Sequence, residues 1–508
     1  MTETPTTRAG EAVLTVRAEA PIGTISPRLY GHFAEHIGRC CYDGLWVGNM
    51  ADPPAHQDGF RTDVVEALRA LPVPLLRWPG GCYADHYHWH DGIGPTASRP
   101  RRLGMSCGFT VEDDNSLGTH EFLQLCALLG AEPYLAGNVG TGSPQELCDW
   151  LEYCNQTLDT DLTRARRANG AFAPFNVPLW GVGNENWGCG GNYDPTTYPH
   201  EYRRYATMLR HVDASAELVA CGEEDAWNVE LLAALGKHLP LVDHLSIHRY
   251  WFEGGAETAF TDDKYYRLLQ QADETEQFVV STAAIIADAT GGRQKIGIAL
   301  DEWGVWHPEA RRLGRDGIPP RQPISFEQAG TMRDALAAGI ALEGFHRQCN
   351  VLTMANLAQV VNILHAPVMT EPGGGPMWLT PTYHVLRLHA PHIGATALPV
   401  EIEAGDTVPG GFSTVSGTAS THGNGDMAIT VINRHLTRGS QVTLRGIAGA
   451  GGVPRAQLLT ADSPRAQNSI ATPDAVAPVS LAVGGDAATG WRIELPPHAI
   501  ATLQFAPR

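Results

Sequence analysis

The sequence predicts an α/β protein: a (β/α)8 TIM barrel with a C-terminal antiparallel β-sandwich of jelly-roll-like form. Three observations predict this fold. The chain has 508 residues, which exceeds one ordinary domain and suits a barrel with a smaller domain. Short apolar runs alternate with amphipathic stretches up to about residue 390, as in parallel βα proteins. Beyond residue 391 the chain is rich in Gly, Thr, Ala and Val, with short alternating runs.

Eight apolar runs supply the expected barrel strands, which is the number that closes such a barrel. They cover residues 28–35, 74–80, 133–139, 178–185, 217–223, 242–250, 295–302 and 351–360. Helical patterns between them cover residues 61–71, 119–130, 144–157, 198–213, 228–238, 263–289 and 326–347. Residues 12–20 alternate like a half-buried strand. We therefore expect residues 1–20 to join the sandwich as a strand, 21–390 to form the barrel and 391–508 the sandwich.

Composition and charge exclude several classes of function. Hydrophobic residues make up 43% and charged residues 18%, as in an ordinary globular protein. Lys and Arg number 36 against 55 Asp and Glu, a net charge of −19, so no nucleic-acid partner is expected. No apolar run approaches the roughly 18 residues that span a bilayer, and Met1 to Glu11 lacks the apolar core of a signal peptide. We expect a cytoplasmic protein with no membrane partner.

Ten cysteines are spread along the chain, and no two have C-x-x-C spacing. They lie at positions 40, 41, 82, 107, 126, 148, 154, 189, 221 and 349. In a chain without an export signal, reduced thiols are expected rather than a disulfide framework.

Two of the expected strands end in the same way, with a carboxylate beside tryptophan and glycine. These are the stretches from Trp180 to Trp187 and from Ile296 to Gly304. A carboxylate at the end of an apolar strand is costly to bury without a purpose, and in a parallel barrel it faces the catalytic mouth. Glu185 and Glu302 are therefore a candidate pair for glycoside hydrolysis, one as protonated acid and one as ionised nucleophile. A structural ion pair at the rim, with Arg77, is the alternative.

The other expected strand ends also carry polar or aromatic side chains. They are Glu35-His36, Arg77 to Cys82, Gly137-Asn138, Glu223-Glu224, His248 to Trp251 and Asn356 to Gln359. Carboxylates and amides suit the hydroxyl groups of a sugar, and aromatic rings suit its apolar face.

Two further patterns have competing interpretations. His86, His88 and His90 would share one face of an extended segment, which allows a zinc site, although a nearly collinear set makes a poor tetrahedron. Hydrogen-bonded histidines in a loop wall are the alternative. Cys82 is either a nucleophile beside a histidine or a small thiol lining a pocket.

Five blocks of the sequence resemble glycoside hydrolase family 51, the α-L-arabinofuranosidases. The blocks are Tyr30 to Arg39, Arg77 to Gly81 with Asp91 to Pro95, Gly183 to Trp187, Asp301 to Trp303 and Ala355 to Asn362. Together they cover most of residues 28–390. The C-terminal part carries no motif, but its β pattern fits the second domain of that family.

The resemblance implies roles for individual residues. Glu302 would be the nucleophile and Glu185 the acid/base of a retaining mechanism, with the two carboxyl groups about 5–5.5 Å apart. The implied substrate-binding set is Glu35, Cys82, Asn184, His248, Tyr250, Trp251 and Gln359. Within it, Asn184 would hold the sugar 2-hydroxyl, Glu35 other ring hydroxyls, His248 and Tyr250 the catalytic carboxylates, and Gln359 the pocket wall. Some members carry Asn where this chain has Cys82, and a thiol is the weaker hydrogen-bond partner.

The sequence thus predicts an exo-acting retaining α-L-arabinofuranosidase that releases terminal arabinofuranosyl residues from arabinan or arabinoxylan oligosaccharides. The resemblance implies no cofactor or metal and a homo-oligomer, often a hexamer. Three alternatives remain: the same machinery acting on a β-xyloside or galactofuranoside, a metal-dependent hydrolase using the three histidines, and a catalytically silent sugar-binding protein.

Overall fold

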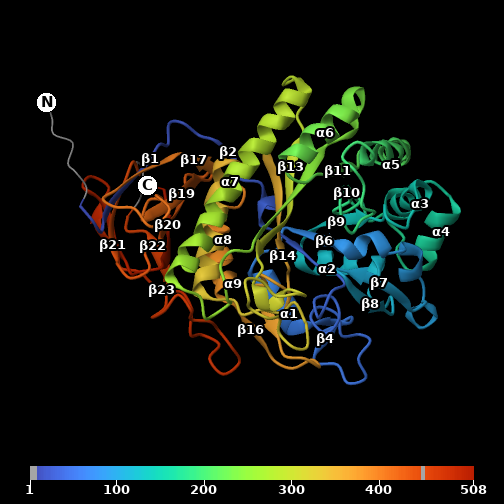
Figure 1. Ribbon diagram of the computed structural model, residues 1–508, viewed down its shortest axis with the longest axis horizontal. Coiled ribbons are helices and arrows are strands. Elements are labelled where there is room, and N and C mark those ends of the chain that lie inside the picture. The colour runs from blue at the N-terminus through green and yellow to red at the C-terminus, as the bar shows by residue number, and fades with distance from the viewer. Residues whose placement is uncertain (1–7, 448–451, 508) are drawn as a thin grey trace.

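The computed structural model describes residues 8–447 and 452–507. It contains a closed barrel of eight parallel strands and a sandwich of two sheets, so the fold class predicted from the sequence is confirmed. In Figure 1 the sandwich lies at the left and the barrel at the right, with the first described strand, in blue, inside the sandwich. Residues 1–7 of the expected N-terminal strand segment lie outside the described residues.

Each of the eight apolar runs overlaps one barrel strand. The strands are β3 (Gly31–Phe33), β6 (Leu75–Trp78), β9 (Glu132–Gly137), β10 (Leu179–Val182), β11 (Glu217–Cys221), β12 (His244–Trp251), β13 (Gly297–Val305) and β14 (Leu352–Ala358). Of these, β9, β12 and β13 extend one to three residues beyond the predicted ranges. They are neighbours in chain order, and β14 pairs with β3 to close the barrel. A layer of buried side chains fills the interior: Leu75, Tyr134, Leu179, Val219, Ala299 and Met354. The barrel is therefore a packed core, open to substrate only at its end.

Helices cover the outside of the barrel. They are α1 (Thr62–Ala70), α2 (Thr119–Leu129), α3 (Pro144–Asn155), α5 (Tyr198–Val212), α6 (Asp225–Leu235), α7 (Asp262–Thr290) and α8 (Met332–Arg347). Local sequence sets their ends: Ser143 accepts a hydrogen bond from the Glu146 N–H ahead of Pro144, and Gly291 ends α7 with φ 59°. The sequence did not predict the short polar helix α4 (Asp161–Ala168), α9 (Pro381–His389), or the hairpin of β7 (Arg102–Ser106) and β8 (Phe109–Asp113).

The sandwich has a seven-stranded and a five-stranded sheet. The first contains β2 (Gly23–Thr24), β17 (Thr396–Leu398), β19 (Val415–Thr421), β20 (Met427–Asn433), β26 (Ala499–Phe505), β22 (Arg455–Leu459) and β23 (Val479–Ser480). The second contains β18 (Val400–Ala404), β1 (Glu11–Val16), β21 (Ser440–Arg445), β25 (Gly490–Leu495) and β24 (Gly484–Asp486). Strand β1 pairs antiparallel with β18 and parallel with β21. The N-terminal segment is therefore built into the C-terminal sandwich.

Helix α8 lies between the barrel and the sandwich and is buried on all sides from Met332 to His346. It packs against α7 and α9 and against β19 of the sandwich. Arg434, just after β20, donates to both carboxylate oxygens of Asp273 on α7, at 2.7 and 3.0 Å. Glu343 of α8 is fully buried, 4.0 Å from the Arg434 guanidinium. Charged groups thus join the two domains through a buried interface.

Three buried histidines also lie at this interface. The rings of His346 and His392 are 4.9 Å apart, and His389 is beside both. Tyr30 contacts His346 Nε2 at 2.8 Å, and both ring nitrogens of His392 contact hydroxyls of the sandwich at 2.8 and 2.9 Å. Burial lowers the pKa of His389 to about 4 and the pKa of the other two well below the ordinary value. We define His346, His389 and His392 as the interdomain histidines.

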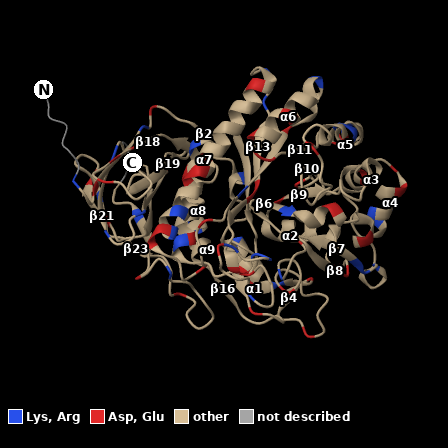
Figure 2. Cartoon of the chain, viewed as in Figure 1, with Lys and Arg blue, Asp and Glu red and all other residues tan. Residues whose placement is uncertain are grey.

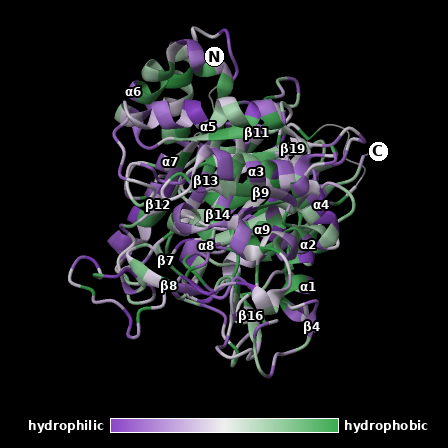
Figure 3. Cartoon of the chain, turned by 90° about the vertical axis from the view of Figure 1, so that its right-hand side faces the viewer, coloured by the Kyte–Doolittle hydropathy of each residue, from purple (hydrophilic) through white to green (hydrophobic). Residues whose placement is uncertain are grey.

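Polar and apolar residues are distributed as expected for this architecture. Figure 3 shows apolar colouring on central strands such as β9 and β11 and more polar colouring on the hairpin β7–β8. In Figure 2, Lys and Arg are interspersed with Asp and Glu over the helices. Within the described residues, no helix has both the length and the apolar character needed to cross a membrane.

Candidate active site

Carboxylates from several strands converge at the C-terminal end of the barrel. They surround a narrow cavity of about 30 Å³. Its lining residues are Glu35, Ile37, Gly81, Cys82, Cys107, Glu185, Tyr250, Glu302, Trp306, Phe326, Gln359 and Leu364. Six of the nine residues predicted from the sequence are in this lining, and Asn184 and His248 lie directly behind it, in contact with its carboxylates or their partners.

Glu302, on β13, is held through both carboxylate oxygens. Nη1 of Arg77 donates to Oε1 at 2.8 Å, and the Tyr250 hydroxyl donates to Oε2 at 2.7 Å. Burial opposes the charge of Arg77, but Asp301 and Glu302 raise the pKa of the guanidinium, so it remains a cation. Burial and the Glu302 charge raise the pKa of Tyr250 well above its ordinary value, so its hydroxyl remains a donor. This arrangement suits an ionised nucleophile in a fixed orientation.

Glu185 follows β10 in an unusual backbone conformation. Its φ is 41°, in the left-handed region that side-chain-bearing residues seldom adopt, and such conformations concentrate at functional sites. Gly183, two residues earlier, has φ 90°, and a Cβ there would lie 2.0 Å from the Asn186 side chain. The turn after the strand therefore needs this glycine. It brings a carboxylate oxygen of Glu185 within 4.8 Å of one of Glu302.

His248, on β12, joins Glu185 to Asp301. Its Nδ1 lies 2.8 Å from Oε1 of Glu185, and its Nε2 lies 3.0 Å from Oδ1 of Asp301. Burial lowers the pKa of His248, but Glu302, Asp301 and Glu185 outweigh it and hold that pKa well above the ordinary value. Burial opposes ionisation of Asp301, yet Arg77 and His248 lower its pKa to about 2. Asp301 was not assigned a role from the sequence, although it adjoins Glu302.

Asn184 and Asp85 fix the loops around the two carboxylates. Oδ1 of Asn184 accepts from Nη2 of Arg77 at 2.5 Å, and its backbone N–H donates to Asp85 at 3.3 Å. Asp85 also accepts from the N–H groups of Val139 and Gly140, each at 2.8 Å. Burial raises the pKa of Asp85 to about 7 in spite of these three donors. One buried side chain thus ties the ends of β9 and β10 together.

Glu35, which follows β3, lines the cavity. Ser106 donates to its Oε1 at 2.6 Å, and Gln359 donates to its Oε2 at 3.1 Å. A Cβ on Gly81 would lie 2.8 Å from this carboxylate, so a larger residue at that position would displace it. Burial and the charge of Glu302 raise the pKa of Glu35 to about 7, against the hydrogen bonds from Ser106 and Tyr83. Near neutral pH this carboxyl group can therefore accept or donate a hydrogen bond to a sugar hydroxyl.

The expectation of reduced thiols is wrong for two of the ten cysteines. Cys82, after β6, forms a disulfide with Cys189, in the loop after β10, and their Cα atoms are 5.4 Å apart. The other eight are free. Cys82 does line the cavity, as predicted, but without an S–H group to donate, and it is not a nucleophile. A sequence separation of 107 conceals the pair, because only barrel closure brings these strand ends together.

The prediction for Trp251 also needs correction, and the three histidines follow the loop-wall interpretation and not the zinc alternative. Trp251 does not line the cavity: its ring is buried behind β12 and donates to Thr275 of α7 at 2.9 Å. Successive residues of a strand point to opposite faces, so with Tyr250 in the cavity Trp251 must point outward. His86 ends one short 3-10 helix, His90 lies in the next and His88 lies between the two, so the three do not form one extended strand. His88 Nδ1 contacts Glu146 at 2.8 Å instead.

Among the described residues, two groups place three possible metal ligands within 4.8 Å of one another, and neither includes those histidines. One is Cys82, Glu185 and Cys189, in which the disulfide occupies both sulfurs. The other is Glu185, His248 and Glu302, whose atoms already form the hydrogen bonds described above.

Sequence reasoning missed the part of the cavity that comes from loops. Ser106 and Cys107 belong to the β7–β8 hairpin, and Trp306, Phe326 and Leu364 follow β13 and β14. These positions carry no motif and no periodic signal. Only Trp306, four residues after Glu302, could have been inferred from its closeness to a strand end.

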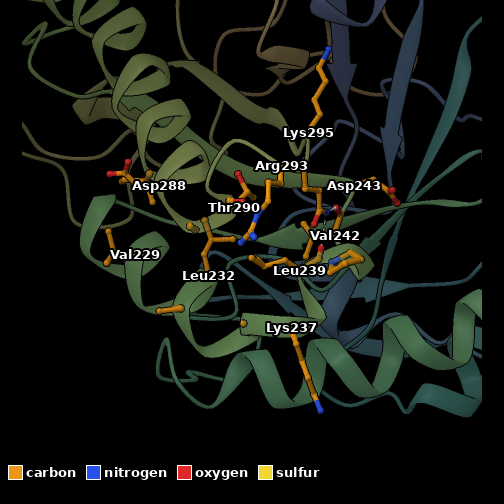
Figure 4. Close-up of a pocket in the computed structure, with 16 residues that line it drawn as sticks. Val229, Leu232, Lys237, Leu239, Val242, Asp243, Asp288, Thr290, Arg293 and Lys295 are labelled. Carbon is orange, nitrogen blue, oxygen red and sulfur yellow. Dashed lines mark hydrogen bonds between the residues drawn. The ribbon is translucent and has the colours of Figure 1, made fainter.

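A larger cavity of about 1080 Å³ lies at the opposite end of the barrel (Figure 4). It is bordered by α6, α7 and the residues just before β12 and β13, such as Asp243 and Lys295. Lys237 and Lys295 point away from its centre in Figure 4. No pair of carboxylates held by an arginine and a histidine faces it among its lining residues. The narrow cavity is therefore the candidate active site.

Two family models match the chain. The α-L-arabinofuranosidase 1 domain matches residues 67–273, and the α-L-arabinofuranosidase C-terminal domain matches residues 301–499. An intracellular exo-α-L-arabinofuranosidase of Bacteroides ovatus is 38% identical over 510 residues, covering 97% of this chain and 95% of that protein. α-L-Arabinofuranosidase C of Emericella nidulans is 33% identical, covering 90% of each chain.

Solved structures resemble this chain over almost its whole length. A crystal structure of the GH51 arabinofuranosidase from Xanthomonas axonopodis pv. citri superimposes with a TM-score of 0.89 at 34% identity, covering 97% of this chain and 99% of that one. The α-L-arabinofuranosidase from Thermotoga maritima, solved as an arabinose complex, gives a TM-score of 0.85 at 29% identity with the same coverage.

Proposed function

The chain belongs to the α-L-arabinofuranosidases of glycoside hydrolase family 51, and we propose that it removes terminal arabinofuranosyl residues from oligosaccharides by a retaining double displacement. The observation that carries the mechanism is the closeness of Glu185 and Glu302, which have carboxylate oxygens within 4.8 Å of each other. Retaining enzymes need about 5–5.5 Å between carboxyl groups, whereas inverting enzymes need about 6.5–9.5 Å to admit a water.

In the first step Glu302 attacks the anomeric carbon while Glu185 gives its proton to the glycosidic oxygen. The bond to the leaving sugar breaks, and an ester forms between arabinose and Glu302. Arg77 and Tyr250 hold the two oxygens of Glu302 in place for this attack. His248 lies against Glu185 and can take up or return the proton that this carboxyl group exchanges.

In the second step Glu185 removes a proton from a water molecule, which attacks the same carbon and breaks the ester. Arabinose leaves with the configuration it had in the substrate, and Glu185 is protonated again for the next cycle. Both steps use side chains and water alone, so we expect no dependence on a metal.

The shape of the cavity supports exo action. The Arg77 guanidinium lies over the ring of Tyr134, 5.6 Å from its centroid, and Tyr134 belongs to the buried layer that fills the barrel interior. A cavity closed in this way accepts one sugar at a chain end, and an internal unit of a polymer cannot pass through it. Glu35, Gln359 and Asn184 offer carboxyl and amide groups to its hydroxyls. We propose arabinan or arabinoxylan oligosaccharides as substrates.

Location and assembly remain predictions. The relative from Bacteroides ovatus is named intracellular, which supports action in the cytoplasm on short imported oligosaccharides. The homo-oligomer, a hexamer by family resemblance, is to be checked by light scattering of the purified protein.

The proposed function is tested with nitrophenyl glycosides of α-L-arabinofuranose, β-D-xylose and β-D-galactofuranose, with and without EDTA. We expect a preference for the arabinofuranoside that EDTA does not change; inhibition by EDTA would favour a metal-dependent hydrolase. Arabinosyl transfer to methanol, followed by proton NMR, tests retention: the expected product is the methyl α-arabinofuranoside, and the β product would indicate inversion. Binding without cleavage would indicate a sugar-binding protein.

A further inference from the structure

A pair of sulfur atoms that the proposed hydrolysis does not use lies beside Glu185. Sγ of Cys189 is 3.8 Å and Sγ of Cys82 is 4.0 Å from Oε2 of Glu185. The opposite oxygen, Oε1, faces His248. The disulfide therefore does more than link two loops, because it lies in contact with the carboxyl group that transfers the proton.

Two sulfurs and a carboxylate oxygen are a ligand set for a thiophilic divalent cation. One ligand atom from each of Cys82, Glu185 and Cys189 lies within 4.8 Å of the other two. Zinc binds thiolate sulfur at about 2.3 Å and carboxylate oxygen at about 2.0–2.2 Å, and three such ligands leave a fourth position for water. In the disulfide neither sulfur can act as a thiolate, so the site exists only after reduction.

We propose that reduction of the Cys82–Cys189 disulfide creates a site for a thiophilic divalent cation such as Zn²⁺, with Glu185 as the third ligand. The cation inhibits the enzyme, because a carboxylate that is bound to a metal cannot donate or accept the catalytic proton. The disulfide withholds the two sulfurs and keeps Glu185 available. The inhibition rests on the proposed role of Glu185 as acid/base, whereas the cation binding does not.

Opening the site is a two-electron reduction. A dithiol attacks one sulfur, the bond between the two sulfurs breaks, and the reductant leaves as its own cyclic disulfide while each cysteine gains one hydrogen. The cation then displaces both thiol protons to the solvent, because the thiolate is the ligand. Removal of the cation and reaction with a low-molecular-weight disulfide re-form the bridge and release the thiols of that reagent.

The location of the two cysteines permits this chemistry. Cys189 is accessible to solvent in the loop after β10, so a reductant can reach it. Cys82 is 6% exposed and lines the cavity. A cation held between them would also stand at the wall of the sugar pocket. Both effects lower activity, one through Glu185 and the other through the space available to the sugar.

A second possible cation site predicts a different dependence of inhibition on the redox state. Glu185, His248 and Glu302 also place their ligand atoms within 4.8 Å, and this set contains no sulfur. A cation bound there would inhibit the oxidised and the reduced enzyme alike. Dependence on the redox state therefore distinguishes the two sites.

The experiment compares the full-length enzyme in its oxidised form with enzyme reduced by dithiothreitol and freed of it by gel filtration under argon. Thiol titration verifies the two states. We expect Zn²⁺ to lower the activity of the reduced form about 100-fold, since general acid–base catalysis contributes about 10²–10⁴-fold. EDTA should restore it, and the oxidised form should be unaffected. Co²⁺ should give a thiolate-to-metal absorption band with the reduced form alone, a readout that does not depend on activity.

Variants identify the ligands. Cys189→Ser should lose both the zinc inhibition, measured relative to its own zinc-free activity, and the cobalt band. Cys349→Ser, which removes a free cysteine outside the cavity, should behave as the unaltered enzyme does. Glu185→Gln should keep the band but bind Co²⁺ more weakly.

Equal zinc inhibition of the oxidised and reduced forms, or full inhibition of Cys189→Ser, would overturn the proposal. So would the absence of a cobalt band in the reduced form, or unchanged cobalt affinity in Glu185→Gln. If no glycoside were cleaved, the function proposed above would fail, while the cobalt measurement would still decide whether the cation site exists.

Discussion

Nδ1 of His248 lies 2.8 Å from Oε1 of Glu185. Because the other ring nitrogen faces the Asp301 carboxylate at 3.0 Å, the imidazole must keep a hydrogen on Nε2. Nδ1 and Glu185 are then left to share one proton. Glu185, the acid of the proposed mechanism, is thus coupled to Asp301 through His248. Asp301 contacts no substrate, so it is a positioning residue that acts through the histidine.

Replacement of Asp301 tests this coupling. Asp301→Asn keeps the shape of the side chain but lets its amide donate to Nε2, which favours the wrong tautomer and turns Nδ1 into a permanent donor toward Glu185. We expect kcat to fall about 10²–10⁴-fold for poor leaving groups, as expected when general acid catalysis is lost. Ser246→Ala, which removes one hydrogen bond to Asp301 but keeps its charge, is the control and should lose far less. Equal losses in both variants would refute the tautomer argument.

Glu302→Ala removes the nucleophile. We expect turnover to disappear on every glycoside, because the ester with the sugar cannot form. Steady-state assays on activated and unactivated arabinofuranosides measure this. Circular dichroism of the variant controls for folding, since removal of Glu302 also leaves Arg77 with one partner fewer. Substantial activity in a folded variant would rule out the nucleophile assignment.

Glu185→Ala removes the acid/base. The first step should survive for aryl glycosides whose leaving groups need little protonation and should be lost for alkyl glycosides. Added azide, which needs no base to attack the ester, should speed turnover of the aryl substrates and yield an arabinosyl azide. If good and poor leaving groups lost activity to the same extent, Glu185 would not be the acid.

The buried carboxyl group of Glu343 should make the folded protein less stable as the pH rises. Burial raises the pKa of this carboxyl group from 4.5 to about 7, against the attraction of Arg434. Its folded pKa lies above the unfolded value, so the folded state holds the proton more tightly, and that stability is lost as pH rises from 4.5 through 7. Glu343→Gln should therefore gain up to about 3 kcal/mol at pH 8 and little at pH 4.5, where both proteins are neutral at this site. Urea unfolding at both pH values measures the gain, and an equal gain at both would contradict the argument.

The interdomain histidines act in the opposite direction. Burial lowers the pKa of His389 from 6.5 to about 4, so the unfolded chain binds a proton that the folded chain does not. Stability should be complete above pH 6.5 and should fall toward pH 4. In His389→Gln, the free energy of unfolding should therefore fall by up to about 3 kcal/mol less between pH 6.5 and pH 4 than in the unaltered protein. Thermal unfolding between pH 4 and 7 checks the slope, with the exposed His90, outside the interface, replaced by Gln as the control. If stability depended on pH in the same way in His389→Gln, the buried imidazole of His389 would not be the cause.

The barrel could be read from the sequence because the same feature recurs at every strand. A buried parallel strand is a continuous apolar run, and the polar residue that follows it must face either solvent or a site. That rule located Glu35, Glu185, Tyr250, Glu302 and Gln359 around one cavity. It failed at Trp251, because the last residues of β12 alternate between the cavity and the helix layer.

The remaining parts of the site depend on contacts that no local pattern encodes. Ser106 reaches Glu35 from a hairpin whose exposed faces give no clear alternation, and Asp85 ties together strand ends that are far apart in sequence. Nothing in the sequence around Cys82 or Cys189 shows that they pair, because the two positions become neighbours only in the folded barrel. Such pairings are set by tertiary structure, so a single sequence does not reveal them.

The parallel pairing of β1 with β21 affects how this protein is made and handled. The ribosome releases β1 before any of the barrel, and its neighbours β18 and β21 only after the whole barrel has been synthesised. The first strand must therefore wait unpaired during elongation, and the sandwich is completed last. A fragment cut after the barrel would carry an orphan edge strand, which invites aggregation, so a separately expressed barrel should begin beyond Thr24. Because the last strand, β26, lies between β20 and β22 in the other sheet, the first and the last described strands both belong to the sandwich.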